Sequence, residues 1–156
     1  SVLKVEFDIS VEDVTTYMDI AYFRFGEFTS QRDYSEGAPN VLSTFELTVK
    51  GGGTDAFRFR MDSTNSSSFD ADGDSVHVIW YMNASGSSTS YTGPDSSTYT
   101  LDDANHALWV DGTVIFDDVD RNTNFTNDSL STFYFRFSTA EASTFKLDNL
   151  TISDSL

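Results

Sequence analysis

The sequence predicts an all-β protein, an antiparallel β-sandwich. Apolar and polar residues alternate over most of its apolar stretches, which is typical of strands with one buried face. The 14 phenylalanines and 7 tyrosines suit packed strands, and no window supports a long amphipathic helix. Nine or ten short strands separated by long polar loops therefore indicate two packed sheets.

Four strands are expected in the N-terminal half of the chain. Each alternates between apolar residues on one side and polar residues on the other, and a glycine or a polar loop follows it. The expected ranges are Leu3 to Ile9, Tyr17 to Phe25, Val41 to Val49 and Phe57 to Met61.

The C-terminal half begins with the most apolar strand, Val76 to Met82, which we expect to be covered on both faces. A long polar interval follows and contains one short strand, Tyr99 to Leu101. Asp111-Gly112 lies between two apolar runs and is the preferred two-residue turn of a hairpin, so we expect a hairpin over Ala107 to Phe116. Trp109 on this hairpin is either packed or an exposed stacking platform.

Two further strands are expected at Ser131 to Phe137 and at Thr144 to Ile152. The second changes phase, because its first two apolar residues share one parity and its last two share the other. A β-bulge at Asp148-Asn149 would keep all four apolar side chains inside.

One motif returns three times in these strands. Phe23-Arg24-Phe25, Phe57-Arg58-Phe59-Arg60 and Phe135-Arg136-Phe137 each alternate a phenylalanine with an arginine, and they hold four of the six arginines in the chain. Neighbouring side chains of a strand point to opposite faces, so the phenylalanines are expected in the core and the arginines on the opposite face.

Composition limits the function. The 156 residues fit a single domain, residues 1–156, and the net charge of −16 argues against nucleic acid as a partner. No stretch approaches the roughly 20 apolar residues of a membrane helix, so we expect no membrane insertion. The absence of cysteine excludes a disulfide scaffold, and the acidic, Ser-, Thr- and Asp-rich composition suggests a module of a larger exported bacterial protein, extracellular or on the cell surface.

Three segments carry a family resemblance: Val76-His77-Val78-Ile79, Leu108-Trp109-Val110-Asp111-Gly112, and the strand from Phe145 to Ile152. Together they resemble the laminin-G-like members of the concanavalin-A-like jelly-roll superfamily, which are used as carbohydrate-binding modules. The resemblance implies a jelly roll of two curved antiparallel sheets, glycan binding or glycan cleavage, and a bound calcium ion in many members.

A glycan-binding face follows if the phenylalanines face the core and the polar residues opposite them gather on one concave sheet. Arginine binds carboxylate or sulfate oxygens through two parallel hydrogen bonds, and aromatic rings stack against sugars. The predicted ligand-binding residues are Tyr22, Arg24, Arg58, Arg60, His77, Tyr81, Tyr134 and Arg136. In the alternative interpretation, the arginines merely form ion pairs with Glu46, Asp19 and Asp62 on a solvated sheet.

Calcium needs several oxygen ligands, and two places could supply them. One is the bulge at Asp148, close to Asp8 if the first and last strands are neighbours. The other is the acidic loop Asp70 to Asp74, whose glycine comes too early for a helix-loop-helix calcium site.

Two enzymatic readings remain open beside binding. His77, Tyr81 and Arg60 could form the acid, base and carboxylate-neutralising groups of a polysaccharide lyase. The Gln-x-His motif of the lyases with this fold is, however, absent. Glu6-Phe7-Asp8 begins like the acidic strand of a glycoside hydrolase, but no second glutamate follows in place.

The leading expectation is therefore a non-catalytic module, tethered to a catalytic or surface-anchoring domain. It would bind an extended acidic or sulfated polysaccharide. A lyase or hydrolase domain and a purely structural or adhesive module are the alternatives.

Overall fold

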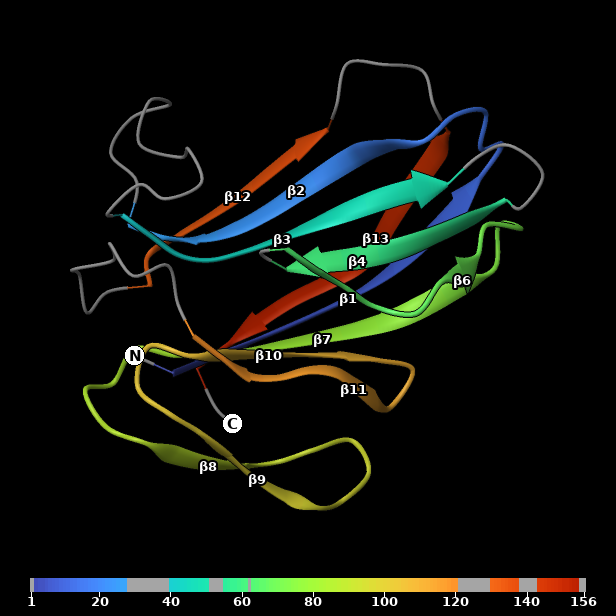
Figure 1. Ribbon diagram of the computed structural model, residues 1–156. Coiled ribbons are helices and arrows are strands. Elements are labelled where there is room, and N and C mark those ends of the chain that lie inside the picture. Colours follow the sequence, from blue (N-terminus) through green and yellow to red (C-terminus); the bar gives the residue numbers. More distant parts are fainter. Residues whose placement is uncertain are drawn as a thin grey trace.

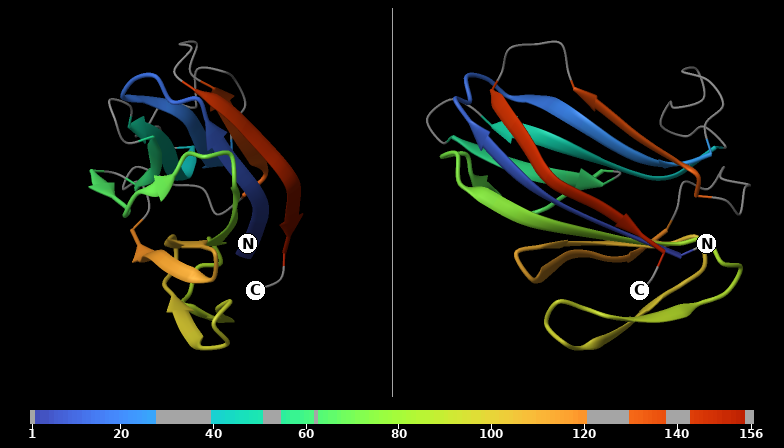
Figure 2. Two further views of the ribbon diagram at one scale, coloured as in Figure 1. Left: turned by 90° about the vertical axis from the view of Figure 1, so that its right-hand side faces the viewer. Right: turned by 180° about the vertical axis from the view of Figure 1, so that it is seen from behind.

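A computed structural model gives the fold and describes residues 2–27, 40–50, 55–61, 63–120, 130–137 and 143–154. All strand pairs in these residues are antiparallel, and the two larger sheets pack face to face, which confirms the predicted all-β sandwich (Figures 1 and 2). The described part of the chain contains no helix that could cross a membrane.

The first sheet has five strands in the order β11-β10-β7-β1-β13. Its strands are β1 (Val2–Glu12), β7 (Ser75–Asn83), β10 (His106–Val110), β11 (Thr113–Val119) and β13 (Thr144–Ser153). Asp111 and Gly112, with φ of 47° and 74°, form the turn between β10 and β11. Two positive φ angles are what the expected hairpin turn requires.

The second sheet has six strands and follows the order β12-β2-β3-β4-β5, with β6 also paired to β4. Its strands are β2 (Met18–Gly26), β3 (Val41–Lys50), β4 (Ala56–Met61), β5 (Thr64–Asn65), β6 (Phe69–Asp70) and β12 (Thr132–Phe137). The two short strands β5 and β6 were not expected, because two residues are too few to show an alternation.

A third sheet is a hairpin of β8 (Thr89–Thr92) and β9 (Thr98–Leu101). It lies below β10 in Figure 1, on the side of the five-stranded sheet that faces away from the six-stranded sheet. β8 was missed because Tyr91 is its only buried residue. The hairpin covers part of β7, and both faces of that strand are buried from Val78 to Asn83; the predicted burial of Val76 to Met82 is thus confirmed from Val78 on, whereas His77 is exposed.

The core lies between the two larger sheets and is strongly aromatic. Phe7 of the first sheet stacks on Phe23 of the second at 5.2 Å, and Phe45 meets Trp80 edge-on at 4.9 Å. Phe57, like these four residues, is fully buried. The repeated motif therefore directs its phenylalanines of β2 and β4 inward, as expected, but in the third copy, on β12, Phe135 is only half-buried and Phe137 is 48% exposed.

The predicted bulge in the last strand is present. The register between β1 and β13 shifts between Glu6 and Asp8, and Asn149 has a φ of 55°. The expectation that all four apolar residues would be inside is wrong for two of them. Leu150 and Ile152 remain 41% and 48% exposed, because β13 is an edge strand.

Candidate functional site

The outer face of the six-stranded sheet brings most of the predicted ligand-binding residues together. Their strands alternate in register, so each side chain opposite a buried phenylalanine emerges on the same side of the sheet. We call this set the arginine face: Tyr22, Arg24, Glu46, Arg58, Arg60, Tyr134 and Arg136.

Four residues of the arginine face form a line across four neighbouring strands. Arg136 of β12 is in register with Tyr22 of β2, Tyr22 with Glu46 of β3, and Glu46 with Arg60 of β4. We call this line the arginine row. Three strand spacings make it about 14 Å long, since neighbouring strands lie about 4.8 Å apart. A line of this length runs across the strands and could contact several units of an extended ligand.

Two arginines flank the ring of Tyr22. The guanidinium carbon of Arg24 lies 5.3 Å from the ring centroid and that of Arg136 lies 5.9 Å from it. Partial burial, followed by the negative charges of Asp19 and Glu46, nevertheless raises the pKa of Tyr22 above its ordinary value of 10. The phenol is therefore protonated at neutral pH and can donate a proton or a hydrogen bond.

The arginines of this face differ in access. Arg24 is buried at 6% exposure, whereas Arg136 is exposed and the side chain of Arg60 is 38% exposed. Arg60 forms ion pairs with Glu46 at 3.4 Å and with Asp19 at 3.9 Å, as the solvated-sheet alternative expects. Arg60 and Arg136 are thus in reach of a ligand, whereas Arg24 is buried beside the Tyr22 ring.

Tyr17 also belongs to this neighbourhood, although it was not predicted. Its hydroxyl accepts a hydrogen bond from Arg58 at 2.6 Å, the guanidinium lies 5.5 Å from its ring, and it is 55% exposed. A register shift between Asp19 and Ala21 interrupts the alternation of β2. Parity counted from the strand therefore could not assign a face to Tyr17, and the presence of a tyrosine just before the strand was the only signal in the sequence.

His77 and Tyr81 do not join the arginine face, so the expectation that they share its sheet is wrong. Both belong to β7, in the five-stranded sheet. Tyr81 is 3% exposed and packs on Tyr91 of the β8–β9 hairpin, with ring centroids 4.3 Å apart. His77, Tyr81 and Arg60 consequently cannot act together as the acid, base and neutralising group of one site.

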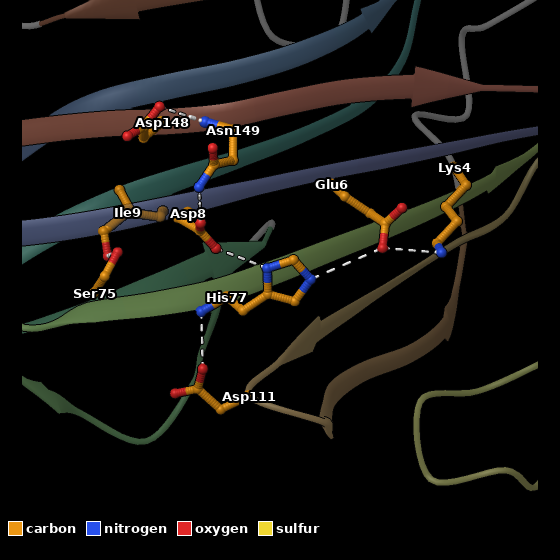
Figure 3. Close-up of polar contacts among 9 residues, drawn as sticks. All are labelled: Lys4, Glu6, Asp8, Ile9, Ser75, His77, Asp111, Asp148 and Asn149. Carbon is orange, nitrogen blue, oxygen red and sulfur yellow. Dashed lines mark hydrogen bonds and ion pairs between the residues drawn. The ribbon is translucent and has the colours of Figure 1, made fainter.

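His77 takes part in a polar network on the outer face of the five-stranded sheet (Figure 3). Its Nδ1 lies 2.7 Å from Oδ1 of Asp8, and its Nε2 lies 3.8 Å from Oε1 of Glu6. The other oxygen of Asp8 accepts a hydrogen bond from the Asn149 side chain. The backbone N–H of His77 donates to Asp111 at 2.8 Å. The network thus links β13, β1, β7 and the β10–β11 turn.

The predicted metal pair lies side by side, since Asp8 and Asp148 are in register. Both carboxylate oxygens of Asp8 accept hydrogen bonds, from His77 and Asn149. Asp148 accepts one from the backbone N–H of Asn149 at 2.8 Å. Among the described residues, no three His, Asp or Glu side chains are arranged around a common metal position. Calcium remains a prediction from the sequence.

Trp109 is packed and offers no stacking platform. It is 1% exposed, meets Tyr99 edge-on at 4.9 Å, and donates from Nε1 to the Tyr91 hydroxyl at 3.2 Å. Of the two interpretations of Trp109, packing is confirmed.

Comparison with known proteins shows similarity in structure only. No family model and no curated protein matches the sequence. Solved structures of the alginate lyase Aly36B do match: the enzyme itself has a TM-score of 0.51 at 16% identity, covering 97% of this chain and 69% of that chain. A variant in complex with alginate trisaccharide has a TM-score of 0.51 at 16% identity, covering 97% of this chain and 70% of that chain. At this identity the likeness establishes the fold and not the activity.

This finding corrects one expectation. The leading sequence-based interpretation was a non-catalytic module, but solved structures that share the fold over nearly the whole chain include those of an enzyme. The laminin-G-like assignment is supported only at the level of a β-sandwich jelly roll.

Proposed function

We propose that this protein is a polysaccharide lyase that cleaves a uronate-containing polysaccharide on its arginine face. The observation that carries the proposal is the arginine row, where two accessible arginines enclose a tyrosine and a carboxylate in register across four strands. The fold shared with an alginate lyase supports it.

The reaction that fits these groups is a β-elimination. A base removes the proton from the carbon next to the uronate carboxylate, and the glycosidic carbon–oxygen bond on the neighbouring carbon breaks. A carbon–carbon double bond forms between these two carbons, and the departing oxygen takes a proton from an acid. No water is consumed. The row must supply a cation that neutralises the uronate carboxylate, a base that takes the proton from carbon and an acid that protonates the departing oxygen.

Arg136 is the group best placed to neutralise the uronate. It is exposed, and its guanidinium lies beside Tyr22. A guanidinium can hold a carboxylate through two parallel hydrogen bonds, which makes the neighbouring carbon–hydrogen bond more acidic. Arg60, at the far end of the row, would hold a second acidic unit of the same chain.

Tyr22 and Glu46 are the proposed proton-transfer pair. The phenol of Tyr22 is protonated at neutral pH and lies in the row beside Arg136, so it is the group proposed to donate to the departing oxygen. Glu46 is the next side chain of the row and is the carboxylate proposed to accept the proton from carbon; it is 8% exposed and forms an ion pair with Arg60 at 3.4 Å, from which the substrate would have to release it. Arg24 is a positioning residue, because its buried guanidinium lies against the Tyr22 ring.

A panel of polysaccharides tests the proposal: polymannuronate, polyguluronate, polygalacturonate, a sulfated galactan and a neutral glucan. Each is incubated with the protein, with and without a chelator, and the ultraviolet absorbance of unsaturated uronate ends is followed. We expect product from at least one polyuronate and none from the glucan. The chelator arm tests whether calcium is needed.

The Tyr22→Phe variant tests the site. It keeps the ring between the two arginines but loses the acidic proton, so kcat should fall by roughly 10² to 10⁴ with little change in KM. Tyr99→Phe is the matched control on the opposite side of the molecule and should keep wild-type activity. If no uronate polymer yields unsaturated ends, or if Tyr22→Phe remains fully active, the proposal is wrong.

A further inference from the structure

A pocket of about 450 Å³ opens between the edges of the two sheets and has no part in the reaction above. One wall is the segment from β5 to β6, at the edge of the six-stranded sheet, and it includes Asn65, Ser67 and Phe69. The other wall is the β10–β11 hairpin and includes Asp111 and Thr113. Its volume is in the range of sites that bind small ligands.

The lining of the pocket combines an apolar surface with hydrogen-bonding groups. Phe69 and Ile115 are half-buried and provide aromatic and aliphatic surface. The side chains of Asn65, Ser67 and Thr113 are exposed and supply an amide and two hydroxyls. A pyranose ring needs both kinds of contact, since its faces are apolar and its rim carries hydroxyls.

The charge of the lining selects against a uronate. Among the described residues that line the pocket, Asp111 is the one charged side chain and none is Lys or Arg. One oxygen of Asp111 accepts the His77 backbone N–H at 2.8 Å, which orients the carboxylate. A second carboxylate would find repulsion and no cation here, whereas a sugar hydroxyl would find a charged acceptor.

The pocket lies at the end of the arginine row. Asn65 is in register with Arg60, so the row continues from β4 to β5 and reaches the pocket wall. From Arg136 to Asn65 there are four strand spacings, about 19 Å in all. If a glycan lies along the row from Arg136 to Arg60, the sugar unit that follows Arg60 therefore reaches this pocket.

We propose that the pocket binds an uncharged sugar unit, so that the substrate is a heteropolysaccharide in which uronates and neutral sugars occur in the same chain. The substrate class rests on the proposed lyase function, and the binding of a neutral sugar to the pocket does not. The arginine row holds the acidic part of the substrate and the pocket holds the neutral part.

Titrations followed by amide NMR test the pocket directly. The probes are the methyl glycosides of glucose, galactose and mannose and, in parallel, of glucuronate and galacturonate. We expect at least one neutral glycoside to shift the amides of 65–69 and 110–115 and to bind at least 10-fold more tightly than its uronate counterpart. If no neutral glycoside shifts these amides, or if a uronate binds there equally well, the proposal is overturned.

Two variants separate this proposal from the lyase function. Thr113→Tyr fills the pocket from an exposed strand position and should abolish the neutral-glycoside shifts, whereas Thr100→Tyr, at an exposed position of β9, should preserve them. Arg136→Ala should also preserve them, because it alters the row and leaves the pocket intact. Glycoside binding that survives Thr113→Tyr, or that is lost in Arg136→Ala, would contradict the assignment even if polysaccharide cleavage is observed.

Cleavage assays then connect the two sites. Thr113→Tyr should raise KM at least 5-fold for a polysaccharide that mixes uronates with neutral sugars, such as a glucuronoxylan, and leave KM for a pure polyuronate unchanged. Equal effects on both substrates would overturn the heteropolysaccharide assignment while leaving lyase activity established.

Discussion

The outer faces of the two sheets are built from the same alternation of residues but differ in what they present. The six-stranded sheet presents a row of arginine, tyrosine and glutamate that includes the exposed Arg136. The five-stranded sheet has part of its outer face covered by the β8–β9 hairpin, beneath which Trp109 and Tyr81 are almost fully buried. One face is suited to a ligand, and the other has become a second, smaller core.

The second core shows how a sheet can lose an outer face. Its buried members are Ile79, Tyr81, Tyr91, Leu101, Ala107 and Trp109. Large apolar side chains at outward positions of β7 and β10 would be costly in water, and the hairpin buries them. The arginine face carries charged residues at the matching positions of its strands, and of these Arg60 and Arg136 remain accessible to water, whereas Arg24 and Glu46 are buried.

The largest effect on stability is expected from Trp109→Ala. The side chain is 1% exposed, and truncation of such a buried tryptophan costs about 3–5 kcal/mol in the free energy of unfolding. Urea denaturation measures this loss. If the two faces are independent, the folded fraction of the variant should keep its kcat/KM. A loss below about 1 kcal/mol would show that the hairpin is not a packed cover.

Arg136→Ala should have the opposite effect to Trp109→Ala, with little loss of stability and a clear loss of substrate binding. The side chain is exposed, so the free energy of unfolding should change by less than about 0.5 kcal/mol. The KM for an acidic polysaccharide should rise about 10-fold, equivalent to about 1.4 kcal/mol, and the effect should shrink at high salt because screening weakens the ion pair.

Lys146→Ala is the control for Arg136→Ala. It removes a cation that is paired with Glu12 and lies on the edge strand β13 of the other sheet. Its KM should remain at the wild-type value. If both variants lose affinity equally, the glycan responds to overall charge rather than to the arginine face.

Tyr91→Phe tests the second core through pH. Burial raises the pKa of Tyr91 to about 12, so the folded state keeps the phenol protonated where the unfolded chain, at about 10, has lost its proton. The stabilisation is therefore present below pH 10 and is lost as pH rises to about 12. Tyr91→Phe should flatten this decline and, through the lost hydrogen bond from Trp109, cost about 1 kcal/mol at neutral pH. Stability curves from urea denaturation across this range measure both effects, and a decline as steep as in wild type would refute the assignment.

The alternation within strands was predictable because it is a local property. Phe57 and Arg58 follow one another in the chain, so their opposite faces can be read from sequence alone. Which strands share a sheet depends on pairing between distant segments. That is why His77 was placed beside Arg60, although β7 pairs with β1 and β10, and β4 pairs with β3.

The candidate site could be predicted only in part for the same reason. The bulge at Asn149 left a phase change in the sequence and was foreseen. The register shift near Ile20 left no comparable signal, so Tyr17 was missed. The pocket between Asn65 and Asp111 depends on two loop-connected edges that come together only in the folded sandwich.

The smallest effect is expected from Asp8→Asn, in the polar network of the five-stranded sheet. Hydrogen bonds from Asn149 and then from His77 lower the pKa of Asp8 below its ordinary value of 3.8. A lowered carboxyl pKa stabilises the folded state above the unfolded value, and this contribution is lost as pH falls through the folded value. The side chain is partly solvated, so the loss on Asp8→Asn at neutral pH should be only about 0.5 kcal/mol, and it should vanish once the pH is below the lowered pKa of Asp8 in the folded state.

The same variant provides the strongest test of where the chemistry lies. Asp8 and His77 form an acid–base pair with an exposed imidazole, which could by itself serve a reaction on this face. If the arginine face is the active site, Asp8→Asn and its control Asp74→Asn, on the exposed loop before β7, should both cleave polysaccharide at the wild-type rate. If Asp8→Asn loses activity while Tyr22→Phe keeps it, the reaction occurs on the five-stranded sheet, and the arginine face would then be limited to binding.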